Sequence, residues 1–377
     1  MLRRLHFDDD INCGEQLTII LVAAAESSRK YERMNPDNKT VPAPLHRGMS
    51  FGFYARNGYY GSAEARAQVD KMKELNIEWV CLISTVLQET FAGGRQFRDF
   101  KMTPADDELR DIIDYIHGKG MKVQLRPMLE CWDGTHRWHI HFPGDGLVIP
   151  GKPITHASRW FESMTDRTLH YARLATRAGC EAYGLDSELD QIVGFNDQWK
   201  EVVKAARSVF TGHLTSSHTA LADFPKQLER SDHWWFDLDS LGNSFYDPVA
   251  DKPGSTKAEM AEKLQASLAH HRSIAEKYGK PYYFGECGCC STAGATRKPW
   301  GWDNPGGYDG EEQARFLEAV FETFWKEPWW MGLYWWKWEE QNDRPQFRSD
   351  PRGDKGFTLD GKPAAQVMKH WYGKTDR

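Results

Sequence analysis

Short runs rich in β-branched and aromatic residues alternate along this chain with amphipathic segments of helical period. The run at 77–84 is apolar at nearly every position, which is typical of a strand buried on both faces of a parallel sheet. A predicted helix starts after a cap at Thr103, with Pro104 at its first position and acidic residues in its first turn. Eight predicted strands result, each followed by a helix or helical turn: 46–54, 77–84, 122–130, 181–188, 213–219, 238–248, 282–287 and 330–339. Strands that alternate with helices predict an α/β fold with a parallel sheet.

The number of strand–helix units favours a single (β/α)₈ TIM barrel. Eight units in about 330 residues match the size and count of that barrel. The alternative, a doubly wound sheet, would carry a glycine-rich phosphate turn after an early strand, and the sequence contains no G-x-G-x-x-G motif. No internal repeat or second domain is evident, so we predict one barrel domain over residues 45–377.

Residues 1–44 are predicted to form an N-terminal extension outside the barrel. They are polar, carry prolines at positions 36, 42 and 44, and show no continuing periodicity. Residues 17–28 resemble the apolar core and small-residue end of a secretory signal, but the aspartates at 8–10 are wrong for its positively charged start. We therefore favour a cytoplasmic location slightly over a secreted or periplasmic one, and export stays open as the alternative.

Charge and composition exclude several classes of partner. The 377 residues carry a formal net charge of −6, which does not suit nucleic acid or an anionic membrane, since both require a basic face. No apolar run reaches the roughly 18 residues of a membrane helix. The cluster of Cys287, Cys289 and Cys290 lacks the second pair of a structural zinc site, so we expect free thiols there. The sequence does not indicate an oligomeric state.

Two glutamates stand at the ends of predicted strands that a barrel would place across its mouth. Glu188 ends the fourth strand and Glu286 ends the seventh, and barrel active sites lie at the C-terminal ends of the strands. Glycosidic bond cleavage needs two carboxyl groups: one protonates the leaving oxygen, and the other attacks the anomeric carbon or activates a water. A single strand-end glutamate more often pairs with an arginine or caps a helix, but two on facing strands predict a catalytic pair.

In this arrangement the chain resembles the clan A retaining glycoside hydrolases and, within that clan, family 113, whose known activity is endo-β-1,4-mannanase. The similar stretches, in order along residues 46–340, are RGMSFGFY, TPADDELRDIIDYIHGKGMKVQLRPMLE, GLDSELDQ, LDSLGNSFYDP, YYFGECG and GLYWWKWE. The resemblance implies that Glu188 is the acid/base and Glu286 the nucleophile. It also implies that Tyr246 hydrogen-bonds the nucleophile and that Trp336 and Trp338 form the floor under the sugar at subsite −1.

Two positions depart from the pattern of these relatives. Ser187 stands where most of the clan has an asparagine that holds the sugar 2-hydroxyl. Met128 stands where the family more usually has a histidine after a basic residue and a proline. Because the orientation of the 2-hydroxyl separates mannose from glucose, both departures leave open a β-linked hexoside other than a mannoside, such as a glucoside or galactoside.

Aromatic and charged residues after the predicted strands suit a carbohydrate site. The chain has 16 tryptophans, and indole rings stack on the C–H faces of sugars. We expect sugar contact from Trp132, after the third strand, and from Trp302, after the seventh. Four further side chains are candidates for binding hydroxyl groups: Arg56, Asn57, Arg126 and Glu130. Asp186 shares the inward parity of Glu188, and we expect it to form a structural salt bridge.

Two other functional classes stay open. A metal-dependent barrel hydrolase would use histidines and aspartates, although its usual His-x-His motif follows the first strand and here the motif follows the third. The candidate ligands are His136, His139, His141, His218 and either Asp237 or Asp239. A carbohydrate-binding barrel without catalysis would need no paired carboxylates. The preferred prediction is a retaining glycoside hydrolase that cleaves a β-linked oligo- or polysaccharide, best a β-1,4-mannan, without metal or cofactor.

Overall fold

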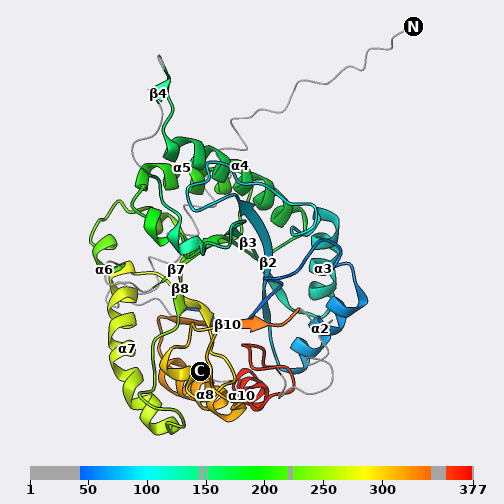
Figure 1. Cartoon of the computed structure of the whole chain (residues 1–377), viewed down its shortest axis with the longest axis vertical. Helices are drawn as coiled ribbons and strands as arrows, with labels where there is room; N and C mark the ends of the chain where they lie inside the picture. Colours follow the sequence, from blue (N-terminus) through cyan, green and yellow to red (C-terminus); the bar gives the residue numbers. More distant parts are fainter. Residues whose placement is uncertain (1–42, 144–147, 150–151, 220–223, 341–353, 376–377) are drawn as a thin grey trace.

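The computed structural model describes residues 43–375 apart from 144–147, 150–151, 220–223 and 341–353. Eight parallel strands close into a barrel (Figure 1), in the order β1-β10-β9-β8-β7-β6-β3-β2. The strands are β1 His46–Phe51, β2 Trp79–Gln88, β3 Lys122–Cys131, β6 Ala182–Ser187, β7 His213–Thr219, β8 Ser240–Phe245, β9 Tyr282–Cys287 and β10 Trp330–Trp338. The predicted (β/α)₈ barrel is confirmed.

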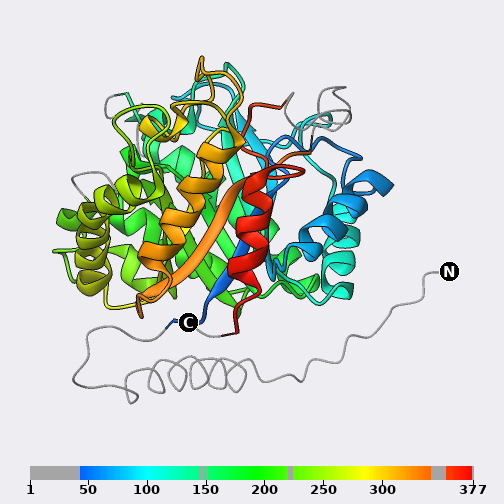
Figure 2. The ribbon, with the colours of Figure 1, turned by 90° about the horizontal axis from the view of Figure 1, so that it is seen from below.

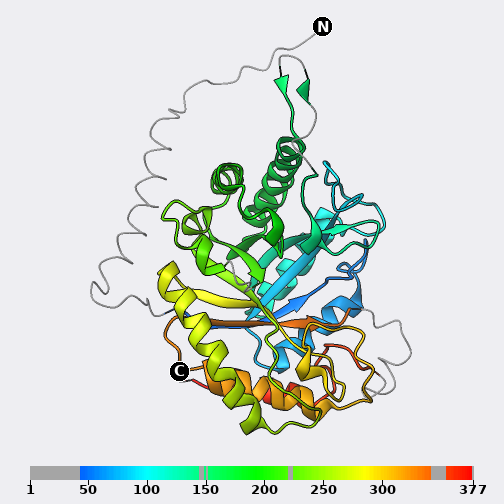
Figure 3. The same ribbon diagram turned by 60° about the vertical axis from the view of Figure 1, so that its left-hand side comes forward.

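Helices between the strands form a ring around the barrel, as Figures 1 and 2 show. They are α2 Ala63–Glu74, α3 Asp106–Gly118, α4 His156–Arg177, α5 Asn196–Arg207, α6 Phe224–Gln227, α7 Lys257–Tyr278, α8 Gly310–Phe324 and α10 Pro363–Tyr372. Short 3₁₀ helices are η1 Arg137–His139, η2 Asp190–Ile192, η3 Trp234–Asp237 and η4 Ala295–Arg297. A small antiparallel hairpin, β4 Val148–Ile149 with β5 Lys152–Pro153, extends away from the barrel (Figure 3).

Local sequence signals determine where several helices begin and end. Ser62 caps α2, and its Oγ accepts the N–H of Ala65 at 3.1 Å. Thr256 caps α7 in the same way. Gly279 ends that helix in the left-handed conformation, with a φ of 66°, which glycine adopts without a steric penalty.

The predicted start of α3 is wrong by two residues. The helix begins at Asp106 and its N-cap is Ala105, not Thr103. Thr103 does not cap the helix: its Oγ1 accepts the N–H of Asp99 at 3.1 Å and donates to Thr85 O on β2 at 2.8 Å. Glu108 replaces it by accepting the N–H of Ala105 at 2.5 Å.

The core contains the residues that the apolar runs indicated. All ten residues of β2 are buried. The tryptophans expected to pack away from the site are buried as well: Trp79, Trp160, Trp199, Trp325 and Trp371. Cys287, Cys289 and Cys290 are buried free thiols, as predicted.

The described chain begins at the end of the barrel opposite the mouth. Ala43 is buried there, and its N–H donates to Pro328 O at 3.1 Å. Residues 1–42 of the predicted extension, including the signal-like segment at 17–28, lie outside the described residues. Within the described part of the chain, none of the helices has the length and apolar character needed to span a bilayer.

Candidate active site

The end of β9 carries an acidic residue into the barrel mouth through close backbone packing. Glu286 is only 2% exposed. At the preceding Gly285, a Cβ atom would lie 2.4 Å from Ser217 Oγ, so the position requires glycine. Gly285 O also accepts a hydrogen bond from Arg126 Nη1 at 3.2 Å. The register between β8 and β9 shifts at the same point, and such bulges re-aim side chains.

Glu188 follows β6 directly and has an unusual backbone conformation. Its φ of 59° lies in the left-handed region, which residues with side chains rarely occupy. Its N–H donates to Ser217 O at 2.9 Å and helps to hold this conformation. Backbone strain of this kind concentrates at functional sites. The conformation therefore supports a functional role for Glu188.

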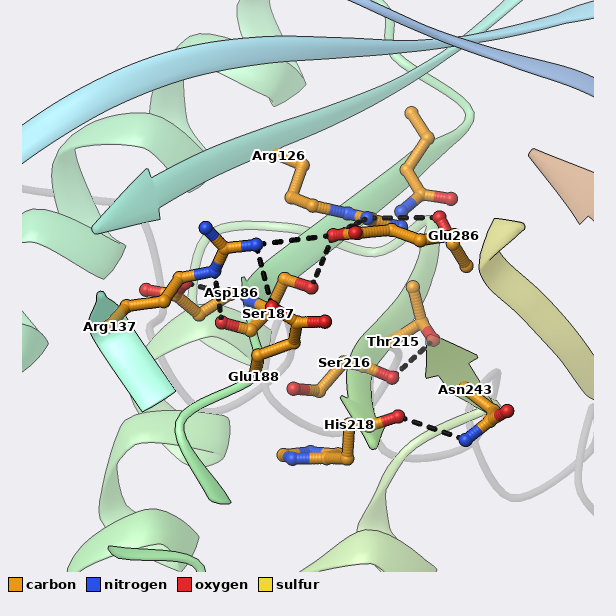
Figure 4. Close-up of polar contacts among 12 residues, drawn as sticks. Arg126, Arg137, Asp186, Ser187, Glu188, Thr215, Ser216, His218, Asn243 and Glu286 are labelled. Atoms are coloured by element: carbon orange, nitrogen blue, oxygen red, sulfur yellow. Dashed lines mark hydrogen bonds and ion pairs between the residues drawn. The ribbon is translucent and has the colours of Figure 1, made fainter. Parts of the chain in front are cut away.

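The two glutamates meet at one guanidinium group, as Figure 4 shows. Arg137, in η1, places Nη2 2.8 Å from Glu188 Oε2 and 3.5 Å from Glu286 Oε1. These two carboxylate oxygens are therefore at most 6.3 Å apart, the sum of the two distances. The side chains of all three residues are almost completely buried. The structure thus brings together the two glutamates on which the sequence prediction depends.

Glu286 is surrounded by hydrogen-bond donors and positive charge. Ser187 Oγ donates to its Oε1 at 2.8 Å, and Tyr246 Oη donates to its Oε2 at 3.0 Å. Arg126 Nη1 lies 3.9 Å from Oε1, beneath the carboxylate. Burial and the neighbouring Glu188 raise the pKa of Glu286 to about 7, while Arg137 and Arg126 oppose the increase. Tyr246 thus makes the contact that the family resemblance implies.

Arg137 is itself held in place from three sides. Its Nη1 donates to Glu130 Oε1, and its Nε donates to Ser187 O at 3.2 Å. The guanidinium carbon lies 5.8 Å from the centre of the Phe53 ring. Neither Arg137 nor Phe53 is among the site residues predicted from the sequence. The signals available were an arginine inside the histidine-rich loop and an aromatic residue after β1, and neither has a spacing that points into the site.

Asp186 forms the structural salt bridge expected for it. Its Oδ2 lies 2.6 Å from Arg167 Nη2, which comes from α4. Its Oδ1 accepts the N–H of Ser187 at 2.7 Å. This pair fixes the backbone immediately before Glu188.

Three of the aromatic side chains predicted to contact sugar lie in or after the C-terminal parts of β10, β3 and β9: Trp336, Trp132 and Trp302. Trp336 is buried near Phe53, with ring centres 5.0 Å apart. Trp132 and Trp302 are 61% and 50% exposed. They follow β3 and β9, which lie on opposite sides of the barrel in the strand order. Trp302 also contacts Tyr54, at 6.1 Å between ring centres.

Trp338 does not form part of the sugar floor. It is buried, and its indole N–H donates to Gln68 Oε1 of α2 at 2.8 Å, on the outside of the barrel. The reason is an irregularity in the pairing of β1 with β10: Met49 pairs with Trp335, but Phe51 pairs with Trp338. The extra residue in β10 turns Trp338 to the outer face, so the role implied for it by the family resemblance is wrong.

Three of the other four predicted binding residues have structural partners. Asn57 Nδ2 donates to Phe100 O at 2.8 Å and ties the loop after β1 to the loop after β2. Arg56 is exposed, and no contact of the described residues links it to either glutamate. Glu130 contacts Arg137, and Arg126 lies beneath Glu286. Of these four, only Arg126 and Glu130 therefore belong to the glutamate cluster.

The histidines proposed as metal ligands do not converge. His136 Nε2 lies 3.6 Å from Glu188 Oε2, whereas the ring of His141 stacks on Phe91. His218 is buried elsewhere, where it accepts the indole N–H of Trp235 at 3.1 Å. Among the described residues, no three histidine, cysteine, aspartate or glutamate side chains are grouped so that they could hold a metal ion.

Comparison with known proteins shows which family and fold the chain shares. The sequence profile of Glycoside Hydrolase Family 113 matches residues 49–362. A family 113 β-mannanase from Alicyclobacillus acidocaldarius, solved in complex with ManMIm, is 29% identical with a TM-score of 0.76, over 87% of this chain and 97% of that one. A second family 113 β-1,4-mannanase structure is 28% identical with a TM-score of 0.73, over 87% and 99% of the two chains.

A more distant structure shares the fold alone. A mutant form of the family 5 mannosidase from Rhizomucor miehei is 11% identical with a TM-score of 0.59, over 87% of this chain and 92% of that one. No curated protein sequence matches the chain. The family profile covers most of the chain, and the site has the glutamate pair that glycosidic cleavage needs. The chain therefore belongs to glycoside hydrolase family 113 and is a glycoside hydrolase.

Proposed function

We propose that this glycoside hydrolase cleaves β-1,4-mannan and manno-oligosaccharides with retention of configuration at the anomeric carbon. Both family 113 structures compared above are described as β-mannanases, and each is matched over nearly its whole length. The proposed reaction uses Glu188, Glu286 and a water molecule, and it requires no cofactor.

The separation of the glutamates carries the proposal of retention. Retaining enzymes hold their two carboxyl groups about 5–5.5 Å apart, and inverting enzymes hold them about 6.5–9.5 Å apart to leave room for a water. The limit of 6.3 Å between Glu188 Oε2 and Glu286 Oε1 lies below the inverting range. This spacing favours direct attack by a carboxylate.

Hydrogen bonding supports the assignment of the two roles. Neighbouring buried carboxyl groups titrate as a pair. Ser187 and Tyr246 both donate to Glu286, which favours its charged form. Burial and the neighbouring Glu188 raise the pKa of Glu286 to about 7, so the pair holds one proton near neutral pH. We propose that this proton lies on Glu188 in the reactive form and that Glu286 is the nucleophile.

Two chemical steps follow from this assignment. Glu286 attacks the anomeric carbon while the proton on Glu188 passes to the departing glycosidic oxygen, which leaves a glycosyl ester on Glu286. Water then attacks the same carbon, gives its proton to Glu188 and releases Glu286 as a carboxylate.

The exposed indoles support action inside a long chain rather than at its end. Trp132 and Trp302 are half exposed or more, and they come from opposite sides of the barrel. Sugar units on either side of the cleaved bond could stack on them. Trp336 and Phe53 would form the apolar wall at the bond itself.

A second candidate substrate is a β-linked hexoside with an equatorial 2-hydroxyl. The hydroxyl group of Ser187 is already engaged with Glu286. Because Ser187 replaces the usual asparagine and its hydroxyl already donates a hydrogen bond to the proposed nucleophile, other groups must recognise the sugar 2-hydroxyl.

Product analysis on a substrate panel tests both parts of the proposal. The panel contains β-1,4-mannan, manno-oligosaccharides, cello-oligosaccharides and aryl β-mannosides, β-glucosides and β-galactosides, and NMR follows the first product formed. We expect the manno-oligosaccharides to react fastest and to release the β-anomer first. Initial α-anomer would reject retention, and faster cleavage of cello-oligosaccharides would reject the mannan preference. Glu286→Gln serves as the control for contaminating activity.

A further inference from the structure

Arg137 contacts both carboxylates of the proposed catalytic pair from one side. Its Nη2 is 2.8 Å from Glu188 and 3.5 Å from Glu286. The side chain is 3% exposed, so water screens these interactions little. In Figure 4 dashed contacts join its guanidinium group to both glutamates.

The proposed reaction moves a negative charge from one glutamate to the other and back. In the first step Glu286 loses its charge as it forms the ester, and Glu188 gains a charge as it gives up its proton. In the second step Glu188 takes a proton from water, and the charge returns to Glu286. A fixed cation within reach of both groups stabilises the charge at either position without moving.

We propose that Arg137 is a positioning residue that serves as the shared counter-ion of Glu188 and Glu286 in both steps, and that Glu130 anchors it there. This inference rests on the proposed two-glutamate mechanism. It assigns to Arg137 an effect on two steps of the cycle rather than on substrate binding alone.

The contacts of Glu188 leave it free to act while it is paired. Arg137 donates a hydrogen bond to Glu188 through Oε2 only. Among the described residues, no hydrogen bond is made to Glu188 Oε1, so this oxygen is available to carry the proton to the leaving group. The charge of Arg137 can thus remain in place while the proton is transferred.

Glu130 explains why the cation stays at this position. The bond from Arg137 Nη1 to Glu130 Oε1 and the bond from Nε to Ser187 O occupy two edges of the guanidinium group. The third donor, Nη2, is thereby directed at the pair. A lysine has one nitrogen and could not hold all of these contacts in this geometry.

The test must account for every charge near Arg137. Acidic groups face it from three strands and their ends, and one histidine lies beside it: Glu130 of β3, Asp186 and Glu188 at β6, Glu286 of β9, and His136 next to η1. Asp186 is already neutralised by Arg167. Burial and Arg137 lower the pKa of His136. Glu130 is therefore the acidic group besides the pair that can be changed to alter the balance.

The experiment compares pH profiles of kcat/KM for three variants with the wild type. Arg137→Ala removes a positive charge, which should raise the pKa of both members of the pair. Both limbs of the profile should then move to higher pH, by about one unit, and the rate should fall about 100-fold or more. Glu130→Gln removes a negative charge, so both limbs should move to lower pH, with a smaller loss of rate.

Arg137→Lys is the matched control, because it keeps the charge and loses the geometry. We expect its limbs to stay near the wild-type positions while its rate falls. Thermal unfolding of each variant checks that the barrel is intact. If Arg137→Ala does not fold, Glu130→Gln and Arg137→Lys decide the question by the same criteria.

Two results would overturn the proposal. In one, the limbs of the pH profile do not move in Glu130→Gln. In the other, they move in the same direction in Glu130→Gln and Arg137→Ala. Activity that survives in Glu286→Ala and Glu188→Ala would instead overturn the two-glutamate mechanism. The two failures can therefore be told apart.

Discussion

The two ends of this barrel both bury polar side chains, but they differ in charge. At the end where the strands begin, His46 Nδ1 and Tyr334 Oη lie 3.0 Å apart. Nearby, Tyr283 Oη accepts hydrogen bonds from Thr215 Oγ1 at 3.2 Å and from Gln124 Nε2 at 3.4 Å. Burial lowers the pKa of His46 well below its usual value, so this network is neutral.

The mouth buries ionisable groups that carry charge. Arg126, Arg137, Glu188 and Glu286 are each less than a tenth exposed. Buried ion pairs add little to stability, because desolvation offsets much of their attraction. The neutral hydrogen-bonded packing at the end where the strands begin indicates a role in stability. The buried charges at the mouth are costly to desolvate, which indicates a role in chemistry.

Loss of the nucleophile should give the largest difference between the two ends. Glu286→Gln keeps the size of the side chain but removes the attacking carboxylate, so kcat should fall by about 10⁵-fold or more. Steady-state rates on a manno-oligosaccharide measure the effect. Tyr283→Phe, at the neutral end, is the control and should keep the wild-type kcat. Equal losses in the two variants would remove the functional contrast between the ends.

Loss of the acid/base should have a smaller effect that depends on the substrate. Glu188→Gln cannot protonate the departing oxygen, so cleavage of oligosaccharides should slow by about 10²–10⁴-fold. An aryl mannoside with a strongly acidic phenol needs no such proton, and its first step should slow much less. Burst kinetics separate the two steps. A loss that is the same for both leaving groups would contradict the role assigned to Glu188.

The mouth should also reduce stability at high pH. The pKa of Glu286 is raised from 4.5 to about 7 by burial and Glu188, so the folded state binds this proton more tightly than the unfolded state. The resulting stabilisation is complete below about pH 4.5 and is lost as the pH rises through 7. Glu286→Gln should therefore be more stable than the wild type by roughly 1–3 kcal/mol at pH 8.

Denaturant unfolding at pH 8 and pH 4.5 measures this difference. The advantage of Glu286→Gln should disappear at the lower pH, where the wild-type carboxyl group is protonated. An advantage that is equal at both values would show that charge burial is not its cause.

The smallest expected effect lies at the neutral end. Tyr283→Phe removes the acceptor of Gln124 and one partner of Thr215, which should lower the free energy of unfolding by about 1 kcal/mol. Because no charge is involved, the loss should be the same at pH 5 and pH 8. A loss that varies with pH would mean that this end is not electrostatically neutral.

The barrel and its glutamates could be predicted from sequence because their signals are local. Each strand is a short run of β-forming residues, and the position of Glu188 and Glu286 follows from where the fourth and seventh runs end. Strand order in a (β/α)₈ barrel then brings the two ends toward a common mouth.

The positions of Arg137 and Trp338 could not be predicted from such local signals. Arg137 lies in a loop without periodicity, and its direction depends on the η1 turn and on the bond to Glu130, which connect only in three dimensions. The family resemblance implied that Trp338 joins Trp336 in the sugar floor, but one extra residue in the pairing of β10 turns Trp338 away from the mouth. Neither feature leaves a pattern in the sequence.

The most direct test of the proposed mechanism is to trap the glycosyl ester. A 2-deoxy-2-fluoro-mannosyl fluoride reacts in the first step and hydrolyses slowly in the second, so the protein should gain the mass of one fluorosugar. Mass spectrometry of the digested protein should place that sugar on the peptide that contains Glu286. A sugar on any other residue, or turnover of the mannoside substrate by an enzyme that never becomes labelled, would contradict the account.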